Sequence, residues 1–441
     1  MKKSFRGAVY AIVTSLSLFC STAWAEDNTY VPTSENIQAR EDFQDNKFGI
    51  FLHWGIYSMP AQGEWYMNNR NISRDEYSKL ASGFYPSHFD AAKWVSAIKA
   101  SGARYLCITS RHHDGFSMFK TATSDYNIVD GTPYHRDILK ELADECHRQN
   151  IGFHVYYSHL DWYREDYPLG RTGHGTGRPK GKENWNSYYA FMNQQLTEIL
   201  TNYGKVNALW FDGVWDHKEK TFDWQLEEQY RLIHKLQPAC LIGNNHHHTP
   251  VSGEDFQMFE RDLPGENKGG HSAGLQVSSL PLETCETMNG MWGYRIEDQN
   301  YKSSDSIVRL LVRSAGKNAN LLLNIGPQPN GDLPALALNR LHKVGEWLGV
   351  YGETIYGTRG GDIAQTSWGV STRKGNKLYL HVLDRPENGL LIAHLNSKVK
   401  NAKLFYEKSP VVFSQKKGVL NIKLPDKIET PDCVIELTLK K

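Results

Sequence analysis

Residues 151–212 carry the pattern that decides the fold: Ile151-Gly-Phe-His-Val-Tyr-Tyr-Ser158, a helical stretch from about 187 to 203, and Ala208-Leu-Trp-Phe-Asp212. Both short stretches are mostly apolar instead of alternating with polar residues, which is typical of strands that are covered on both faces. A strand, a helix and a second buried strand form one unit of a parallel sheet. The segment therefore predicts a sheet built from repeated β-α units.

The same alternation continues on both sides of this segment. Further strand-like stretches lie at 48–55, 105–109, 241–244 and 320–325, and further helical stretches at 90–100, 136–149, 225–236, 306–314 and 333–348. This number of repeats favours a closed (β/α)8-like (TIM-type) barrel over an open doubly wound sheet. No GxGxxG motif follows a first strand, so the main argument for a nucleotide-binding fold is absent.

The pattern changes from about Tyr356 onward. Short alternating segments separated by Gly, Pro, Asn and Lys lie at 378–382, 390–394, 402–405, 419–424 and 433–439. Such segments predict an antiparallel β-sandwich. We therefore expect a catalytic barrel over 26–352 and a C-terminal β-sandwich over 353–441.

The first 25 residues have the pattern of a signal peptide. A basic start is followed by a mostly apolar stretch from Ala8 to Phe19, and Ala23-Trp-Ala25 offers small residues at the −3 and −1 positions of a cleavage site. The apolar stretch is too short for a membrane-spanning helix. We expect cleavage after Ala25 and a secreted or periplasmic protein.

Composition excludes several classes of partner. Lys+Arg (50) and Asp+Glu (49) leave a net charge of +1, which predicts neither nucleic-acid nor membrane binding. Five of the six cysteines lie after residue 25 without a CxxC pair, which disfavours a disulfide framework or a zinc knuckle. Aromatic residues make up 12%, a mild indication of carbohydrate binding as well as of a large core.

Polar side chains gather where the predicted strands end. The groups are His53-Trp54, Arg111-His-His-Asp114, Tyr156-Tyr-Ser158, Trp210-Phe-Asp212 and Asn244-Asn-His246. Barrel enzymes carry their reacting groups at the C-terminal ends of the strands, whereas core packing does not require polar groups there. Asp212 follows a buried strand between Trp210 and Trp215, a setting that suits a nucleophile attacking an anomeric carbon.

Several segments together resemble the retaining α-L-fucosidases of the glycoside hydrolases. They are Phe48-Gly-Ile-Phe-Leu-His-Trp-Gly55, Arg111-His-His-Asp-Gly-Phe116, Tyr156-Tyr-Ser158, Leu209-Trp-Phe-Asp212, Asp262-Leu-Pro-Gly265, Trp292-Gly-Tyr294 and Asn320-Leu-Leu-Leu-Asn-Ile-Gly-Pro327. The match runs in order over essentially the whole chain after residue 25. The resemblance implies an exo-acting enzyme that removes terminal α-L-fucosyl residues by double displacement.

The resemblance also implies roles for individual residues. Asp212 matches the nucleophile that forms a covalent fucosyl ester. Trp292 matches an aromatic residue near the C6 methyl group of fucose. The other implied sugar contacts are His53, Glu64, Trp65, His112, His113, Tyr156, Trp210 and His246, the last in a loop where the family often has an arginine.

The acid/base residue has three candidates, because the family places it at different points of the sequence. Glu254 comes first by its spacing from Asp262-Leu-Pro-Gly265, and Asp255 would serve if the register shifts by one residue. Glu283 is the third candidate, in Leu282-Glu-Thr-Cys285, where the family usually has a Trp before the Glu. Retaining enzymes need the two carboxyl groups only ~5–5.5 Å apart.

Three rival interpretations stay open at this point. A metal-dependent barrel hydrolase would use His53, His112, His113 and Asp212 as ligands. A non-catalytic sugar-binding barrel and an exo-glycosidase for α-L-galactosides are the other two. Under the favoured interpretation the chain needs no metal or other cofactor. Its partner is a fucosylated oligosaccharide or glycoconjugate, and a homo-oligomer is compatible with the sequence.

Overall fold

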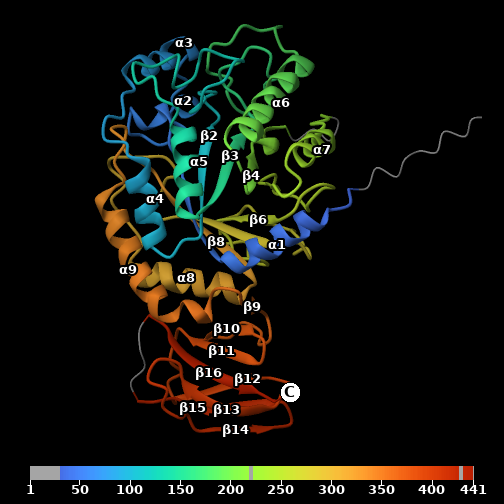
Figure 1. Ribbon diagram of the computed structural model, residues 1–441, viewed down its shortest axis with the longest axis vertical. Coiled ribbons are helices and arrows are strands. Elements are labelled where there is room, and N and C mark those ends of the chain that lie inside the picture. Colours follow the sequence, from blue (N-terminus) through green and yellow to red (C-terminus); the bar gives the residue numbers. More distant parts are fainter. Residues whose placement is uncertain (1–29, 218–221, 427–430, 441) are drawn as a thin grey trace, which may run out of the picture.

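The computed structural model describes residues 30–217, 222–426 and 431–440, and the predicted signal peptide lies outside these ranges. The described chain forms a barrel of parallel strands surrounded by helices, followed by a smaller all-β part (Figure 1). The barrel strands are β1 (Phe48–Leu52), β2 (Tyr105–Arg111), β3 (Gly152–Ser158), β4 (Ala208–Asp212), β5 (Leu241–Asn244), β6 (Gln257–Glu260), β7 (Leu282–Thr287) and β8 (Ala319–Ile325).

The eight strands are hydrogen-bonded in the order β5-β4-β3-β2-β1-β8-β7-β6, which leaves one open seam between β5 and β6. Asp255 closes this seam: its backbone N–H donates to the Ile242 carbonyl (2.7 Å), and its carboxylate accepts from the Ile242 N–H (2.8 Å). Arg40 of helix α1 (Ser34–Asn46) then pairs with the same carboxylate at 2.6 Å. The predicted barrel is therefore confirmed, with a side chain completing the last strand pair.

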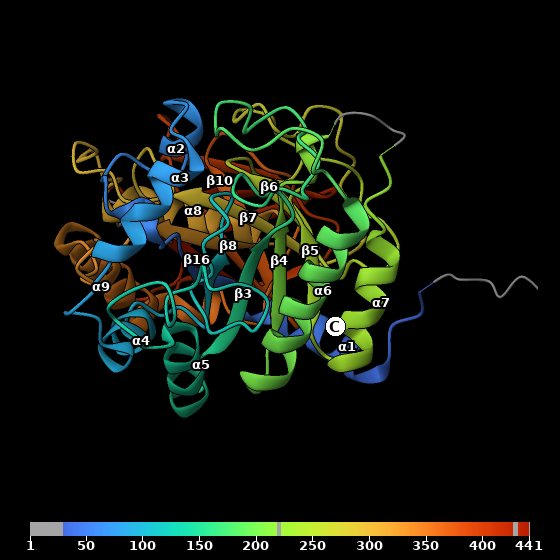
Figure 2. The same ribbon diagram turned by 90° about the horizontal axis from the view of Figure 1, so that it is seen from above.

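Helices cover the outside of the barrel, as the view from above shows (Figure 2). Along the chain they are α2 (Tyr66–Asn69), α3 (Arg74–Tyr77), α4 (Ala91–Ala100), α5 (Ile138–Gln149), α6 (Trp185–Asn202), α7 (Leu226–Leu236), α8 (Ser304–Gly316) and α9 (Ala335–Tyr351). Asp90 and Asp137 cap α4 and α5 by accepting from backbone N–H groups (both 3.0 Å). Gly102 ends the α4 region at φ +85°, a conformation that suits glycine.

The sequence pattern did not indicate two of the barrel strands, β6 and β7. Both contain buried polar residues whose groups are satisfied by tertiary contacts: in β6 the amide of Gln257 donates to the Gln276 carbonyl (2.9 Å), and in β7 Thr284 donates to the Asp262 carbonyl (3.0 Å). A buried polar group is tolerated when it is hydrogen-bonded, so an apolar pattern is not required.

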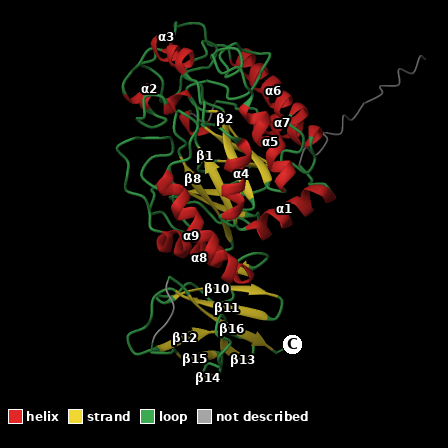
Figure 3. Cartoon of the chain, turned by 60° about the vertical axis from the view of Figure 1, so that its left-hand side comes forward, coloured by secondary structure: helices red, strands yellow, loops and turns green. Residues whose placement is uncertain are grey.

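The C-terminal part consists of two antiparallel sheets below the barrel (Figure 3). The strands are β9 (Arg359–Gly360), β10 (Gly369–Lys374), β11 (Lys377–Val382), β12 (Leu390–His394), β13 (Val399–Leu404), β14 (Phe413–Lys416), β15 (Val419–Lys423) and β16 (Cys433–Leu439). Leu380, Leu391, Leu420 and Ile435 are fully buried between the sheets, each contributing about 1.5–3 kcal/mol of hydrophobic stabilisation. The predicted β-sandwich is confirmed, and it packs against the barrel through α8.

Two further features concern membranes and cysteines. Within the described ranges, none of the helices combines the length and the apolar character needed to cross a bilayer. The five cysteines after residue 25 are all buried, and no disulfide bond joins any two of them. Over residues 30–217, 222–426 and 431–440, packing of the core therefore stabilises the fold without disulfide crosslinks.

Candidate active site

A cavity of about 450 Å³ opens at the C-terminal ends of the barrel strands. It contains Asp212 and all but one of the predicted sugar contacts: His53, Glu64, Trp65, His112, His113, Tyr156, Trp210 and Trp292. His246 is the exception. It is buried behind the cavity wall, where its Nε2 bonds the carboxylate of Glu254 (2.9 Å), and its neighbour His247 lines the cavity instead.

Asp212, the last residue of β4, accepts from three donors within 3 Å. Its Oδ1 accepts from the backbone N–H of Gly213 (2.8 Å) and from the indole N–H of Trp215 (2.7 Å). Its Oδ2 accepts from the hydroxyl of Tyr156 (2.9 Å). Gly213 turns the chain at φ +95°, where an added Cβ would lie 2.7 Å from the side chain of Leu160. The carboxylate is therefore fixed in orientation at the cavity surface.

The pKa of Asp212 is raised to about 6, mainly by burial and next by the negative charge of Glu260. The hydrogen bonds from Trp215 and Tyr156 oppose this rise because they stabilise the ionised form. At neutral pH the carboxylate is ionised and available as a nucleophile.

Two of the cavity histidines present a hydrogen-bond acceptor to the cavity. The Nδ1 of His53 lies 2.7 Å from the Asn324 oxygen, which must accept because the Asn324 amide group donates to the Trp292 carbonyl (2.7 Å). Burial lowers the pKa of His53 to about 3, so the ring is neutral. Its proton is therefore on Nδ1, and Nε2 carries a lone pair.

The same arrangement holds for His113, whose Nδ1 lies 2.7 Å from Ser158 Oγ. The single hydroxyl proton of Ser158 is donated to the Leu160 carbonyl (2.6 Å), so Ser158 accepts from His113. Burial lowers the pKa of His113 to about 3, and its Nε2 faces Asp212 Oδ2 at 3.6 Å. A substrate hydroxyl in the cavity can donate its proton to either of these two acceptors.

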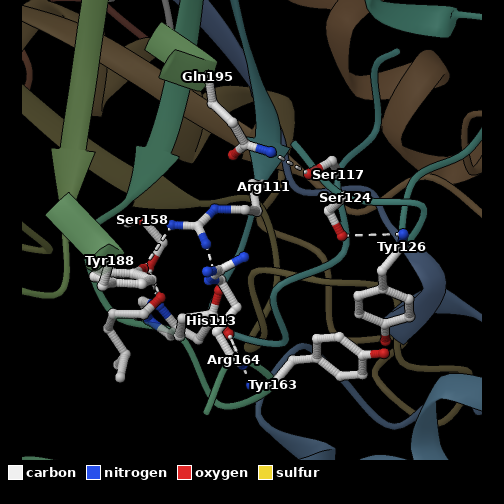
Figure 4. A network of polar contacts seen from close by, with 12 residues as sticks. Arg111, His113, Ser117, Ser124, Tyr126, Ser158, Tyr163, Arg164, Tyr188 and Gln195 are labelled. Atoms are coloured by element: carbon white, nitrogen blue, oxygen red, sulfur yellow. Dashed lines mark hydrogen bonds and ion pairs between the residues drawn. The ribbon is translucent and has the colours of Figure 1, made fainter. Parts of the chain in front are cut away.

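A buried arginine supports this wall of the cavity. Arg111 is fully buried, forms an ion pair with Asp161, and donates to the Ser158 carbonyl (2.6 Å) and the Tyr188 hydroxyl (2.8 Å). Figure 4 shows its guanidinium beside Ser158 and Tyr188. Such a charge is tolerated in the core because it is paired and hydrogen-bonded.

The strand that carries Arg111 also explains how two adjacent histidines reach one cavity. The register of β2 against β3 shifts between Thr109 and Arg111. The strand ends just after this irregularity, and the rings of His112 and His113 lie 4.1 Å apart on the same cavity. Regular strand geometry would have sent them to opposite faces.

None of the three carboxylates predicted as the acid/base residue lines the cavity. Glu254 is buried and accepts from the Tyr230 hydroxyl (3.1 Å) and from His246. Asp255 closes the barrel seam. Glu283 lies inside the barrel, where it accepts from the Tyr105 hydroxyl (2.7 Å) and the Trp210 indole N–H (3.0 Å). All three have structural partners in place of access to a substrate.

Glu260, the last residue of β6, is the carboxylate that faces Asp212 in the cavity. The Asn245 amide nitrogen lies 2.9 Å from Glu260 Oε2 and 3.5 Å from Asp212 Oδ1. These two oxygens are therefore at most 6.4 Å apart (the 3.5 Å and 2.9 Å contacts laid end to end). Sequence reasoning missed Glu260 because it missed strand β6, although the strand-end rule that found Asp212 applies to both.

The environment of Glu260 favours its ionised form. Burial by itself raises the pKa, but the hydrogen bond from His247 (3.2 Å), the nearby charge of His271 and the hydrogen bond from Asn245 outweigh it. The pKa of Glu260 is lowered to about 2 as a result. In the free site both carboxylates are thus ionised at neutral pH.

The other cavity residues that the sequence did not single out as sugar contacts surround this pair. They are Phe51, Arg171, Trp215, Asn245, His247, Arg261 and His271. Within the described ranges, one group of three potential metal ligands has its ligand atoms within 4.8 Å of one another: His247, Glu260 and His271. The metal-ligand set of the rival interpretation, which combines His53, His112, His113 and Asp212, does not meet that geometry.

Two carboxylates that contact one amide nitrogen, in an aromatic-walled cavity at the C-terminal end of a barrel, form the arrangement of a glycoside hydrolase. A family model described as alpha-L-fucosidase matches residues 17–353. The chain belongs to this α-L-fucosidase family of glycoside hydrolases.

Individual relatives agree with this assignment. Human tissue alpha-L-fucosidase is 28% identical over 382 residues, which cover 79% of this chain and 76% of the relative. The structure of alpha-L-fucosidase isoenzyme 1 from Paenibacillus thiaminolyticus is 34% identical, covers 92% of this chain and all of its own, and has a TM-score of 0.81. A trapped covalent intermediate of a Bacteroides thetaiotaomicron alpha-L-fucosidase, obtained with 2-fluoro-fucosyl fluoride and a Glu-to-Gln variant, is 25% identical, with coverage of 93% and 100% and a TM-score of 0.81.

Proposed function

We propose that this chain is a retaining exo-α-L-fucosidase with Asp212 as nucleophile and Glu260 as acid/base. The observation that carries the proposal is the contact of both carboxylates with the single amide of Asn245. Asp212 Oδ1 and Glu260 Oε2 are therefore at most 6.4 Å apart, which is compatible with the ~5–5.5 Å separation of the carboxyl groups in retaining enzymes.

The reaction follows from this geometry in two steps. Asp212 attacks the anomeric carbon while Glu260 gives a proton to the departing glycosidic oxygen, which produces a β-fucosyl ester and the free aglycone. Glu260 then removes a proton from water, and the water oxygen attacks the same carbon and releases Asp212. Two inversions give α-L-fucose with net retention.

Glu260 must take up a proton from solvent as the substrate binds, because it is ionised in the free site. In the free site His247 and Asn245 hydrogen-bond to the ionised carboxylate, which suits the base of the second step. A leaving group that enters the cavity and displaces His247 removes the largest interaction that lowers the pKa, and burial then raises it. Protonated Glu260 can then donate its proton to the leaving group in the first step.

Sugar recognition rests on the neutral histidines and the aromatic wall. The Nε2 atoms of His53 and His113 accept from substrate hydroxyl groups, and Trp292, whose ring lies 5.2 Å from that of His53, offers an apolar surface. L-Fucose presents both features, because it combines ring hydroxyls with a C6 methyl group. We therefore assign terminal fucosyl units of an oligosaccharide or glycoconjugate as the substrate class.

The decisive experiment compares three variants on aryl fucosides with good and poor leaving groups. Asp212→Gly should lose at least about 10⁴-fold in kcat with both substrates, since the covalent step is gone. Glu260→Ala should lose about 10²–10⁴-fold, mostly with the poor leaving group, and azide should restore part of the rate. Glu254→Gln is the matched control and should stay within about threefold of wild type per folded molecule.

Two results would contradict the assignment. Wild-type turnover in Asp212→Gly would refute Asp212 as the nucleophile. Azide rescue of Glu254→Gln instead of Glu260→Ala would assign the acid/base role to Glu254. NMR observation of the first-formed anomer tests retention, and β-L-fucose as the initial product would exclude it.

Export, which the N-terminal pattern supports, is part of the proposal and is tested by fractionating cells for a chain that begins at Glu26.

A further inference from the structure

Three potential ligands of a metal ion meet at the rim of the cavity. His247 lies in the loop after β5, Glu260 ends β6, and His271 lies in the loop that follows β6. The Nε2 of His247 is 3.2 Å from Glu260 Oε2, the rings of His247 and His271 are 5.0 Å apart, and the potential ligand atoms of all three lie within 4.8 Å of one another.

The donor set determines which ions fit. Two imidazoles and one carboxylate with an open fourth position form the His₂Glu set of zinc sites. A tetrahedral ion with bonds of about 2.1 Å needs its ligand atoms about 3.4 Å apart, which rotations of the two histidine side chains can provide. Calcium and magnesium prefer all-oxygen ligands, so the two imidazoles disfavour them.

The surroundings also suit a cation. Asn245 donates to Glu260 Oε2 (2.9 Å) and fixes the orientation of that carboxylate, as outer-shell partners do in metal sites. Asp212 adds a second carboxylate, whose Oδ1 lies 3.5 Å from the same amide nitrogen. All three residues line the cavity, so water or a sugar hydroxyl could reach an ion that they bind.

We propose that His247, Glu260 and His271 bind Zn²⁺ or a similar late transition-metal ion, and that the bound ion reversibly inhibits hydrolysis. The inhibitory part rests on the proposed role of Glu260: a carboxylate that coordinates the ion can neither give a proton to the leaving group nor take one from water. The metal is thus an inhibitor that acts at the acid/base, with no part in turnover.

Binding is tested first, without any measurement of activity. Co²⁺ added to the mature wild-type chain should give the visible absorption of a tetrahedral cobalt site, and Zn²⁺ should displace it. His271→Ala and His247→Ala should each weaken Zn²⁺ binding by more than about 100-fold in calorimetric titration, because loss of a direct ligand exceeds the ~10–100-fold effect of an outer-shell change. His248→Ala is the matched control.

The control is a histidine in the same loop whose ring stacks on that of His246 at 5.7 Å and which does not line the cavity. It should bind Zn²⁺ with the affinity of wild type. Wild-type protein that binds no ion at millimolar Zn²⁺, or His271→Ala and His247→Ala that bind as tightly as wild type, would each overturn the metal site.

Inhibition is tested second. Saturating Zn²⁺ should slow wild-type hydrolysis of a fucoside with a poor leaving group by more than about 100-fold, and a chelator should restore the rate. Zn²⁺ that binds through the histidines and leaves turnover unchanged would overturn the inhibition and, with it, the role of Glu260. If Glu260→Ala shows azide rescue but wild type binds no ion, the metal site fails while the proposed function stands.

Discussion

Glu283 offers the sharpest prediction, because it is a buried carboxylate inside the barrel with no access to the cavity. It accepts from Tyr105 (2.7 Å) and Trp210 (3.0 Å), and only 1% of its surface is exposed. Burial raises its pKa from 4.5 to about 7, against the two hydrogen bonds, which lower it. The substitution Glu283→Gln keeps the shape of the side chain and removes its titration.

The magnitude follows from linkage. As pH rises above 4.5 the unfolded chain releases this proton, whereas the folded chain retains it up to about pH 7. The unfolded state then binds fewer protons, so the free energy of unfolding falls by about 1.4 kcal/mol per pH unit over this interval. The destabilisation totals roughly 3 kcal/mol. It is complete above pH 7 and absent below pH 4.5.

Urea unfolding from pH 4 to 8 measures this effect. Glu283→Gln should match wild type at pH 4 and exceed its free energy of unfolding by roughly 3 kcal/mol at pH 8. Glu286→Gln is the control on the same strand, because Glu286 is partly exposed and faces Lys302 at 3.5 Å. It should follow the wild-type pH profile.

The same variant separates a structural role from a catalytic one. Glu283→Gln should hydrolyse aryl fucosides within about threefold of the wild-type rate per folded molecule. A pH profile of unfolding identical to that of wild type would refute the argument from burial. A rate loss of more than about 100-fold that azide partly restores would return Glu283 to the acid/base role.

Three further predictions concern the barrel seam that Asp255 closes, the hydrogen bond between His113 and Ser158, and the aromatic ring of Trp292. Asp255→Asn should lower the free energy of unfolding by about 3–5 kcal/mol in urea, because it leaves the Arg40 charge unpaired, with kcat per active site unchanged. Ser158→Ala should lower kcat/KM about tenfold, since His113 loses the acceptor that fixes its proton on Nδ1; an unchanged value would dismiss this role. Trp292→Ala should reduce the preference for α-L-fucosides over α-L-galactosides about 10–100-fold in competing kcat/KM measurements, and an unaltered ratio would place the methyl group elsewhere.

The sequence by itself determined the parts of this protein that depend on buried apolar strands. Strand β4 is buried along its whole length, so its apolar pattern was visible and Asp212 could be placed at its C-terminal end. The same reasoning predicted the positions of His53, His112, His113 and Tyr156 at strand ends. Parallel strands in a barrel bring these ends together whatever the details of packing.

Only the tertiary structure decided which second carboxylate faces Asp212. Strand β6 has only four residues and begins with Gln257, a buried polar residue that donates to the Gln276 carbonyl. Its sequence therefore shows no apolar pattern that predicts a strand. Glu254 and Asp255 differ from Glu260 through partners remote in sequence, such as Arg40 and Tyr230. A carboxylate becomes structural or catalytic according to the donors that fold around it, and sequence spacing does not contain that information.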